Sequence, residues 1–212
     1  MATNRSESLT GTLDLPFPEY ADPPPEPLGL LRRWLAEAER LGVREPRALA
    51  LATADPRGRT SVRSIVLHSL TDRGLLFTSH EGSRKGRELR ANPWASALLY
   101  WREAGRQISV SGPVRRVPDA LSDELWAGRP LFTHAMTVST RQSEPLADPE
   151  ELRERARAVA LAGPQPRPAA YIGLELSAQT VEFWSDGSDR LHERLHYERT
   201  PPGRWTATRL QP

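Results

Sequence analysis

The chain has 212 residues and a formal net charge of +2, with 26% of its residues charged and 38% hydrophobic. A nucleic-acid-binding protein normally carries a stronger basic excess, so this near-neutral balance argues against one. The sequence has no cysteine, which excludes a disulfide framework and a thiolate metal site. The polar start of the chain lacks a secretory signal pattern and no apolar run reaches membrane-spanning length, so we expect a cytoplasmic protein without a membrane partner.

Residues 1–27 are rich in proline and acidic side chains and predict a flexible N-terminal tail. The only apolar patch of this tail, Leu15–Tyr20, is a candidate docking element. Residues 28–212 are expected to form a single domain. Leucine and alanine residues at helical spacing predict that this domain opens with a helix over residues 28–41.

The first half of the domain is expected to be mainly β. Alternating or β-branched runs bounded by turn sequences predict strands over residues 47–54, 61–70, 75–80, 94–101 and 106–117. The Gly-Pro pair in the last of these runs predicts a β-bulge. A short helix is expected over residues 84–91, before Asn92-Pro93.

The second half alternates between helix and strand signals. It predicts a helix over residues 119–127, an irregular connection over 128–147, a helix over 149–162, and strands over 171–177, 180–184, 191–199 and 205–210. Several antiparallel strands at this spacing are typical of a barrel. We therefore expect an α+β fold that is mainly β, with helices packed outside an antiparallel barrel.

Lys85 is the only lysine among the 29 basic residues, and it lies in the sequence Gly82-Ser83-Arg84-Lys85-Gly86. Arginine offers a planar fork of donors, whereas lysine concentrates its charge on one rotatable group. Together with a serine hydroxyl and free backbone N–H groups at a helix start, they are suited to bind a phosphate. An ordinary solvated basic turn is the alternative interpretation.

Other donors could serve the same anion. Arg63 lies in an otherwise apolar strand, Thr78 and Ser79 end the strand that leads to Gly82, and Gln142-Ser143 follow Arg141 in the irregular connection. Each has a simpler explanation, such as pairing of Arg63 with a local carboxylate or polarity at a strand edge. Their common feature is that all could donate to one phosphate group.

Two further stretches suggest recognition of a ligand. The carboxamide of Gln107 could bond the N–H and C=O edge of a heterocycle, or it could simply lie exposed on its strand. In a strand, Arg190, His192 and Arg194 would point to one face, where they would meet an anion or carboxylates. The five histidines are not spaced as in a zinc site, so no metal is predicted.

Ten short motifs follow one another in a recognisable order along residues 28–212. They are Arg63–Leu67, Thr78-Ser79, Gly82–Gly86, Asn92-Pro93, Arg106-Gln107, Arg129-Pro130, Arg141–Ser143, Glu182–Trp184, Arg190–Arg194 and Arg209–Pro212. Together they resemble the flavin-dependent pyridoxamine 5′-phosphate oxidase family, whose members have an FMN-binding split β-barrel. No single motif is specific, but the set is.

The resemblance implies a homodimer that seats FMN at the subunit interface. The residues that it assigns to FMN are Arg63, Ser64, Val66, Leu67, Thr78, Ser79, Arg84, Lys85, Gln107, Gln142, Ser143, Trp184 and Arg194. The residues that it assigns to the substrate are Arg190, His192, Arg129, Thr133 and His68. It assigns no single residue as the catalytic acid or base.

Two substitutions in the implied substrate site separate this chain from the oxidase that makes pyridoxal phosphate. That oxidase has lysine in place of His68 and tyrosine in place of Leu125, and both normally bind the substrate phosphate. Histidine is not permanently charged at neutral pH, and leucine offers no hydrogen bond. Such a pocket suits an aromatic carboxylate better than a phosphate monoester.

Within the family, residues 15–19, 42–54, 92–96 and 99–103 are most similar to the oxidase of phenazine biosynthesis. The resemblance implies an FMN-dependent oxidase of reduced (dihydro or tetrahydro) phenazine carboxylic acid precursors, with dioxygen as the final acceptor and hydrogen peroxide as a product. Two alternatives stay open: a pyridoxine/pyridoxamine 5′-phosphate oxidase, and a flavin-binding protein without enzymatic activity.

Overall fold

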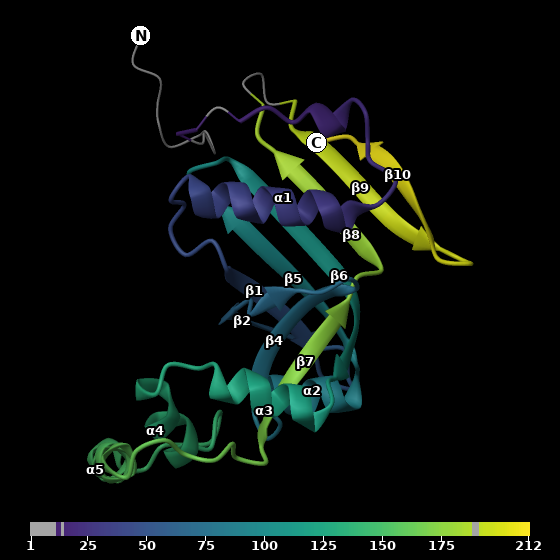
Figure 1. Ribbon diagram of the computed structural model, residues 1–212. Coiled ribbons are helices and arrows are strands. Elements are labelled where there is room, and N and C mark those ends of the chain that lie inside the picture. The colour runs from purple at the N-terminus through teal and green to yellow at the C-terminus, as the bar shows by residue number, and fades with distance from the viewer. Residues whose placement is uncertain (1–11, 14, 188–190) are drawn as a thin grey trace.

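The computed structural model describes residues 12–13, 15–187 and 191–212, and Figure 1 shows its elements in colour along the chain. The helical segments are η1 (Pro18–Tyr20, a 3₁₀ turn), α1 (Pro27–Arg40), α2 (Arg84–Ala91), α3 (Asp119–Ala127), α4 (Phe132–Ser139) and α5 (Pro149–Leu161). The strands are β1 (Ala48–Ala54), β2 (Thr60–Val66), β3 (Ser69–Leu70), β4 (Gly74–His80), β5 (Trp94–Trp101), β6 (Arg106–Arg116), β7 (Tyr171–Ser177), β8 (Thr180–Ser185), β9 (Glu193–Thr200) and β10 (Arg204–Leu210). The expected α+β fold with a mainly antiparallel sheet is confirmed.

The strands pair in the order β10-β9-β8-β6-β5-β1-β2, and β7 joins β6 to β4 so that the sheet curls into a half-barrel. The long strand β6 changes partner, pairing with β8 through residues 106–111 and with β7 through residues 114–116. Its pairing with β5 continues without a break through Gly112 and Pro113, so the prediction of a bulge there is wrong. These two residues instead lie where β6 changes its other partner from β8 to β7. A Cβ at Gly112 would lie 1.9 Å from the Ser177 carbonyl oxygen, which explains the glycine.

The core lies between α1 and the inner face of the sheet. Figure 1 shows α1 lying across β5, β6 and β8. Its leucines and Trp34 are buried, and the Trp34 ring meets that of Phe183 on β8 edge-on at 5.2 Å. The strands β1, β5 and β6 alternate between buried and less buried residues, as expected when one face of a sheet packs on the core.

The opposite face of the sheet, here called the outer face, carries apolar side chains that nothing in the described chain covers. Strand register places Val62 and Val66 of β2 on the same face as alternate residues of β5, because Ala50 of β1 lies opposite both Ser64 and Leu98. The exposed apolar residues of this face are Val62, Val66, Trp94, Leu98 and Tyr100. A surface of this kind is typical of a protein–protein interface.

Within the segment expected to be a tail, residues from 15 onward pack against the helix α1 and the sheet. Phe17 is buried and its ring meets Trp34 edge-on at 4.8 Å. The Arg106 side chain donates to the Pro16 carbonyl at 2.7 Å, and the Tyr197 hydroxyl donates to the Pro24 carbonyl at 3.0 Å. The candidate docking patch Leu15–Tyr20 thus contains the buried Phe17.

Replacing Phe17 by alanine is expected to lower the free energy of unfolding by about 3 kcal/mol, because the change removes a buried ring from the core. Chemical denaturation monitored by tryptophan fluorescence would measure the change. Phe132→Ala is the matched control, since the Phe132 side chain is 84% exposed and its loss should have little effect. Equal stability of the two variants would contradict the docked arrangement.

Two other expectations differ from the structure. The connection over residues 128–147 is not wholly irregular, because α4 forms within it and packs on α5, and the buried His134 of α4 stacks on the Trp126 ring of α3 at 4.1 Å. The strand expected over 61–70 divides into β2 and β3, since the chain crosses from β1 to β4 between them: Leu67 N–H donates to the Arg47 carbonyl, and His68 N–H to the Leu76 carbonyl.

No helix in the described part of the chain is both long and apolar enough to cross a membrane.

Candidate functional site

The start of α2 is fixed tightly against the end of β4. The Ser83 hydroxyl accepts from Gly86 N–H at 3.2 Å and caps the helix. A Cβ at Gly86 would lie 2.3 Å from the Glu81 carbonyl oxygen, so glycine allows the first turn to pack on the preceding loop. Arg84 and Lys85 are therefore held at a defined position beside the sheet.

A cavity of about 570 Å³ opens at this point between β2, the end of β4, α2 and the segment that precedes α5. Its lining residues are Ser61, Val62, Arg63, Ser64, Ile65, Thr78, Arg84, Lys85, Gln142 and Ser143. Three stretches that lie far apart in the sequence thus contribute donors to one cavity. The lining residues include most of the residues that the sequence predicted to bind a phosphate.

Lys85 is the most enclosed cation of the cavity, with only 8% of the residue exposed. Its Nζ donates to Gln142 Oε1 at 2.8 Å. Burial, with a smaller contribution from the nearby Arg63 charge, lowers the pKa of Lys85 to about 8. The neighbouring backbone N–H of Arg84 donates to Ser143 Oγ at 3.1 Å, where Ser143 has a φ of 73°, a conformation uncommon for a residue other than glycine.

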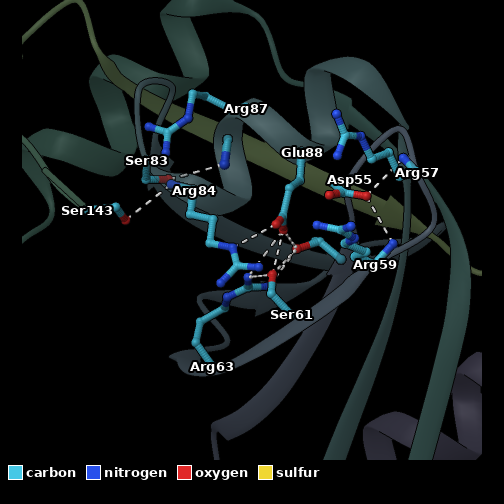
Figure 2. Close-up of polar contacts among 12 residues, drawn as sticks. Asp55, Arg57, Arg59, Ser61, Arg63, Ser83, Arg84, Arg87, Glu88 and Ser143 are labelled. Atoms are coloured by element: carbon cyan, nitrogen blue, oxygen red, sulfur yellow. Dashed lines mark hydrogen bonds and ion pairs between the residues drawn. The ribbon is translucent and has the colours of Figure 1, made fainter.

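Glu88 lies four residues after Arg84 on α2 and forms ion pairs with Arg84 and Arg63, two of the three cations that line the cavity (Figure 2). Its Oε1 accepts from Arg84 Nε at 2.9 Å, and its Oε2 accepts from Ser61 Oγ at 2.6 Å and from the Thr53 hydroxyl. Burial by itself would raise the pKa of Glu88, but the hydrogen bonds from Ser61, Thr53 and Arg84 lower it to about 2. Sequence reasoning missed Glu88, although its i,i+4 spacing from Arg84 was a signal.

A second, smaller cavity of about 260 Å³ lies on the outer face of the sheet. It is lined by Leu98, Gln107, Ser109, Glu182, Trp184, Arg194 and Pro212. Register explains this grouping, because Gln107 lies opposite Trp184, which in turn lies opposite Arg194. Arg194 donates to Glu182 at 2.8 Å and to the Gln211 carbonyl at 3.0 Å, and the bond to Glu182 raises the pKa of Arg194.

His192 lies beside this second cavity and just before β9, which begins at Glu193 rather than at the expected residue 191. Its ring lies 4.9 Å from that of Trp184, tilted by 41°. The Gly187 N–H donates to His192 Nδ1 at 3.3 Å, so the neutral ring carries its proton on Nε2. Arg190 lies outside the described residues.

The other residues expected at the substrate line neither of the two cavities. The Arg129 guanidinium lies 5.1 Å from the Tyr171 ring centre and 5.5 Å from that of Trp126. Burial lowers the pKa of His80, and the positive charges of Lys85 and Arg129 lower it further, so both cations act on this side of the protein.

His68, Thr133 and Leu125 complete the positions expected near the substrate. The His68 ring is exposed with its Nδ1 3.3 Å from Ser69 Oγ, and burial of part of the ring, with the Arg47 charge, lowers its pKa. The Thr133 hydroxyl donates to the Pro130 carbonyl at 2.8 Å. Leu125 is buried against the backbone of Gly173, where an added Cβ would come within 2.8 Å of its Cδ1.

Not every residue expected at the cofactor lies in a cavity. The Leu67 side chain is fully buried in the core, Val66 is exposed on the outer face, and Ser79 Oγ lies 3.3 Å from Ser83 Oγ beneath the start of α2. The rest divide between the two cavities, which share no lining residue within one chain.

The residues present fit the two chemically different ends of FMN. Arg63, Arg84 and Lys85 with the Ser143 hydroxyl are suited to bind a phosphate dianion. Trp184 and Gln107 offer an aromatic face and a carboxamide, which are suited to a flat heterocycle with donors and acceptors on its edge.

The chain is similar to known proteins along most of its length. Residues 35–162 match the family model described as pyridoxamine 5′-phosphate oxidase, and residues 171–212 match the pyridoxine 5′-phosphate oxidase C-terminal dimerisation region. The chain is 54% identical over 208 residues to the dihydrophenazinedicarboxylate synthase of Pseudomonas chlororaphis, covering 98% of this chain and 93% of that protein. It is 40% identical over 191 residues to the pyridoxine/pyridoxamine 5′-phosphate oxidase of Rubrobacter xylanophilus, covering 89% and 88%.

A solved structure is similar over almost the whole chain. It is the crystal structure of PhzG from Burkholderia lata in complex with tetrahydrophenazine-1-carboxylic acid, with a TM-score of 0.92 and 50% sequence identity, covering 95% of this chain and 100% of that one. The half-barrel described above is therefore the split barrel that the motifs implied.

Proposed function

Since this chain belongs to the pyridoxamine 5′-phosphate oxidase family, we propose that it is an FMN-dependent oxidase of reduced, carboxylated phenazine precursors. Two relatives support this choice: the one at 54% identity is named a dihydrophenazinedicarboxylate synthase, and the related crystal structure contains tetrahydrophenazine-1-carboxylic acid. The observation that carries the proposal is a contrast between two anion sites. The proposed cofactor phosphate site gathers Arg63, Arg84 and Lys85 in one cavity, whereas two of the positions that the resemblance assigns to a substrate phosphate hold the exposed His68 and the buried Leu125.

Each end of FMN would have its own set of residues. Arg63, Arg84 and Lys85 would hold the phosphate, while Gln107 and Trp184 would meet the ring system. The chemistry that FMN supplies when bound is two-electron oxidation of the substrate, with dioxygen as the final acceptor and hydrogen peroxide as the product.

The chain's own residues would bind and orient the substrate. The Arg129 guanidinium lies beside the rings of Trp126 and Tyr171 and would pair with a substrate carboxylate through its planar fork. His192, with Nδ1 accepting from Gly187, presents Nε2–H as a donor. The substrate becomes aromatic on oxidation, so a dedicated strong base is unnecessary.

We further propose a homodimer in which each complete site combines the larger cavity of one chain with the smaller cavity of its partner. Three observations support it: the two cavities are separate in one chain, the outer face is apolar and exposed, and residues 171–212 match a region named for dimerisation.

The function is tested by anaerobic titration of the purified, FMN-loaded protein with a dihydrophenazine carboxylic acid. The flavin absorbance near 450 nm is expected to bleach within seconds and to return on admission of air. Pyridoxamine 5′-phosphate serves as the competing substrate, because Arg129 and Thr133 are the phosphate-binding positions that remain. Comparable turnover of pyridoxamine 5′-phosphate would favour the family's oxidase activity, and no bleaching with either compound would favour a flavin-binding protein without activity.

A further inference from the structure

Glu88 is a buried carboxylate to which the proposed function gives no role. Only 6% of the residue is exposed, and it does not line the cavity in which FMN phosphate is proposed to bind. It extends from α2 toward Thr53 of β1 and Ser61 of β2, and it accepts a hydrogen bond from Arg84, which lines the cavity (Figure 2). Any effect of Glu88 on a ligand must therefore pass through its neighbours.

The two oxygens of Glu88 hold two different arginines. Oε1 accepts from Arg84 Nε at 2.9 Å. Oε2 accepts from the hydroxyls of Ser61 and Thr53 and lies 3.4 Å from Arg63 Nη2. One carboxylate thus fixes cations that come from a helix and from a strand.

The two hydroxyls connect Glu88 to Arg63. Each donates its hydrogen to Glu88 Oε2 and is left with lone pairs that accept from the guanidinium. Arg63 Nη1 donates to Thr53 Oγ1 at 2.7 Å, and Arg63 Nη2 donates to Ser61 Oγ. The direction of these hydrogen bonds requires an acceptor at the position of Oε2.

Glu88 also sets the charge of the cluster. Three cations and one carboxylate leave a net charge of +2, which matches the dianion of a phosphate monoester. Without Glu88, three cations would repel one another in a partly enclosed site, and the two arginines would lose the acceptor that orients them.

We propose that Glu88 is a positioning residue that gives this site its preference for a phosphorylated flavin over the same flavin without phosphate. The inference rests on the proposed binding of FMN and adds the residue that organises the phosphate end. Glu88 acts through Arg84 and Arg63 and touches no part of the ligand.

The test compares FMN with riboflavin, using flavin fluorescence to titrate flavin-free protein. In Glu88→Gln the single carbonyl oxygen can accept from the hydroxyls or from Arg84 but not from both, and the amide group meets the remaining donors. We expect the FMN dissociation constant to rise at least about tenfold, while that of riboflavin changes less than about twofold. Thr53→Val, which leaves Glu88 in place but removes one connecting hydroxyl, should shift the same ratio by a smaller factor.

Glu175→Gln is the matched control, because Glu175 is also buried and ion-paired, at 2.8 Å to Arg73, on a strand that does not line the cavity. When Arg84 is already replaced by alanine, Glu88→Gln should raise the FMN dissociation constant by a smaller factor, since one of the two arginines that Glu88 holds is absent. The inference would be overturned if Glu88→Gln lost the same affinity for FMN as for riboflavin, so that the ratio of the two dissociation constants stayed unchanged. Tighter FMN binding in Glu88→Gln would also overturn it. Wild-type protein that binds neither flavin would overturn the proposed function itself, and the wild-type titration separates the two cases.

Discussion

Lys85→Met is expected to weaken FMN binding by about 10- to 100-fold while making the flavin-free protein more stable. A hydrogen bond between charged groups contributes about 1.5–3 kcal/mol, and each 1.4 kcal/mol is a tenfold change in affinity. In the absence of a phosphate the buried ammonium donates to Gln142 and lies near the like charge of Arg63. Methionine fills a similar volume without that cost, so we expect a gain of about 1 kcal/mol, or about 2–4 °C in Tm.

Equilibrium dialysis against FMN and thermal unfolding of the flavin-free protein measure the two effects. Arg87→Met is the control, because Arg87 is exposed on the same helix and lies outside the cavity lining. A Lys85→Met variant that keeps its full complement of flavin after dialysis would show that the phosphate lies elsewhere.

The same lysine predicts how affinity depends on pH. Its folded-state pKa of about 8 lies below the ordinary 10.5, so the folded protein without phosphate binds fewer protons than the unfolded chain between these values. A phosphate dianion favours the ammonium, so binding above pH 8 must take up a proton. FMN affinity should therefore fall as pH rises above about 8, by up to about tenfold per pH unit, and Lys85→Met should abolish this dependence. The stability of the flavin-free protein should instead rise across the same range.

Trp94→Glu is expected to convert a dimer into monomers that bind FMN at least about tenfold more weakly. Trp94 is 48% exposed on the outer face and lines neither cavity, so the substitution acts on the proposed interface alone. Burying an unpaired carboxylate in an apolar interface costs several kcal/mol. Loss of the partner removes the cavity that holds Gln107 and Trp184 from each phosphate site.

Light scattering gives the mass of the variant, and the flavin titration gives its affinity. Leu161→Glu provides the comparison, since Leu161 is 90% exposed at the end of α5 and away from the outer face. A monomeric Trp94→Glu protein with wild-type FMN affinity would mean that one chain forms a complete site, and a dimeric one would place the interface on another surface.

The sequence predicted correctly those helices and strands that are marked by their own residues and by the residues next to them. The bounds of α2, α3, β5 and β7 match the expectation because each combines a clear period with a turn or proline at its ends. The division into β2 and β3 was missed because it depends on a change of partner strand, and strand partners are distant in sequence. The apolar patch Leu15–Tyr20 was recognisable as a candidate docking element, but the surface that buries Phe17, which includes Trp34 of α1, could not be read from the sequence.

The residues of the candidate site also differ in how far the sequence could predict them. Arg63, Arg84, Lys85, Gln142 and Ser143 could be chosen from residue type and motif, and the fold places them in one cavity. The spacing of Glu88 from Arg84 suggested a pair on one helix, but its sequence neighbours do not reveal that Thr53 of β1 and Ser61 of β2 also donate to it. A carboxylate that organises cations is recognised only once the surrounding donors are in place.

The solitary lysine of this chain has a consequence for its chemistry. Primary-amine side chains are the targets of acylating agents, aldehydes and other electrophiles, and proteins of this size normally spread such reactions over many surface lysines. Here every such event on a side chain falls on one nitrogen inside the larger cavity, and because the pKa of Lys85 is lowered to about 8, that nitrogen is more often the reactive free amine at neutral pH than an ordinary lysine is. Chemical damage to lysine in this protein is therefore all-or-none: the cavity either keeps its ammonium or loses it.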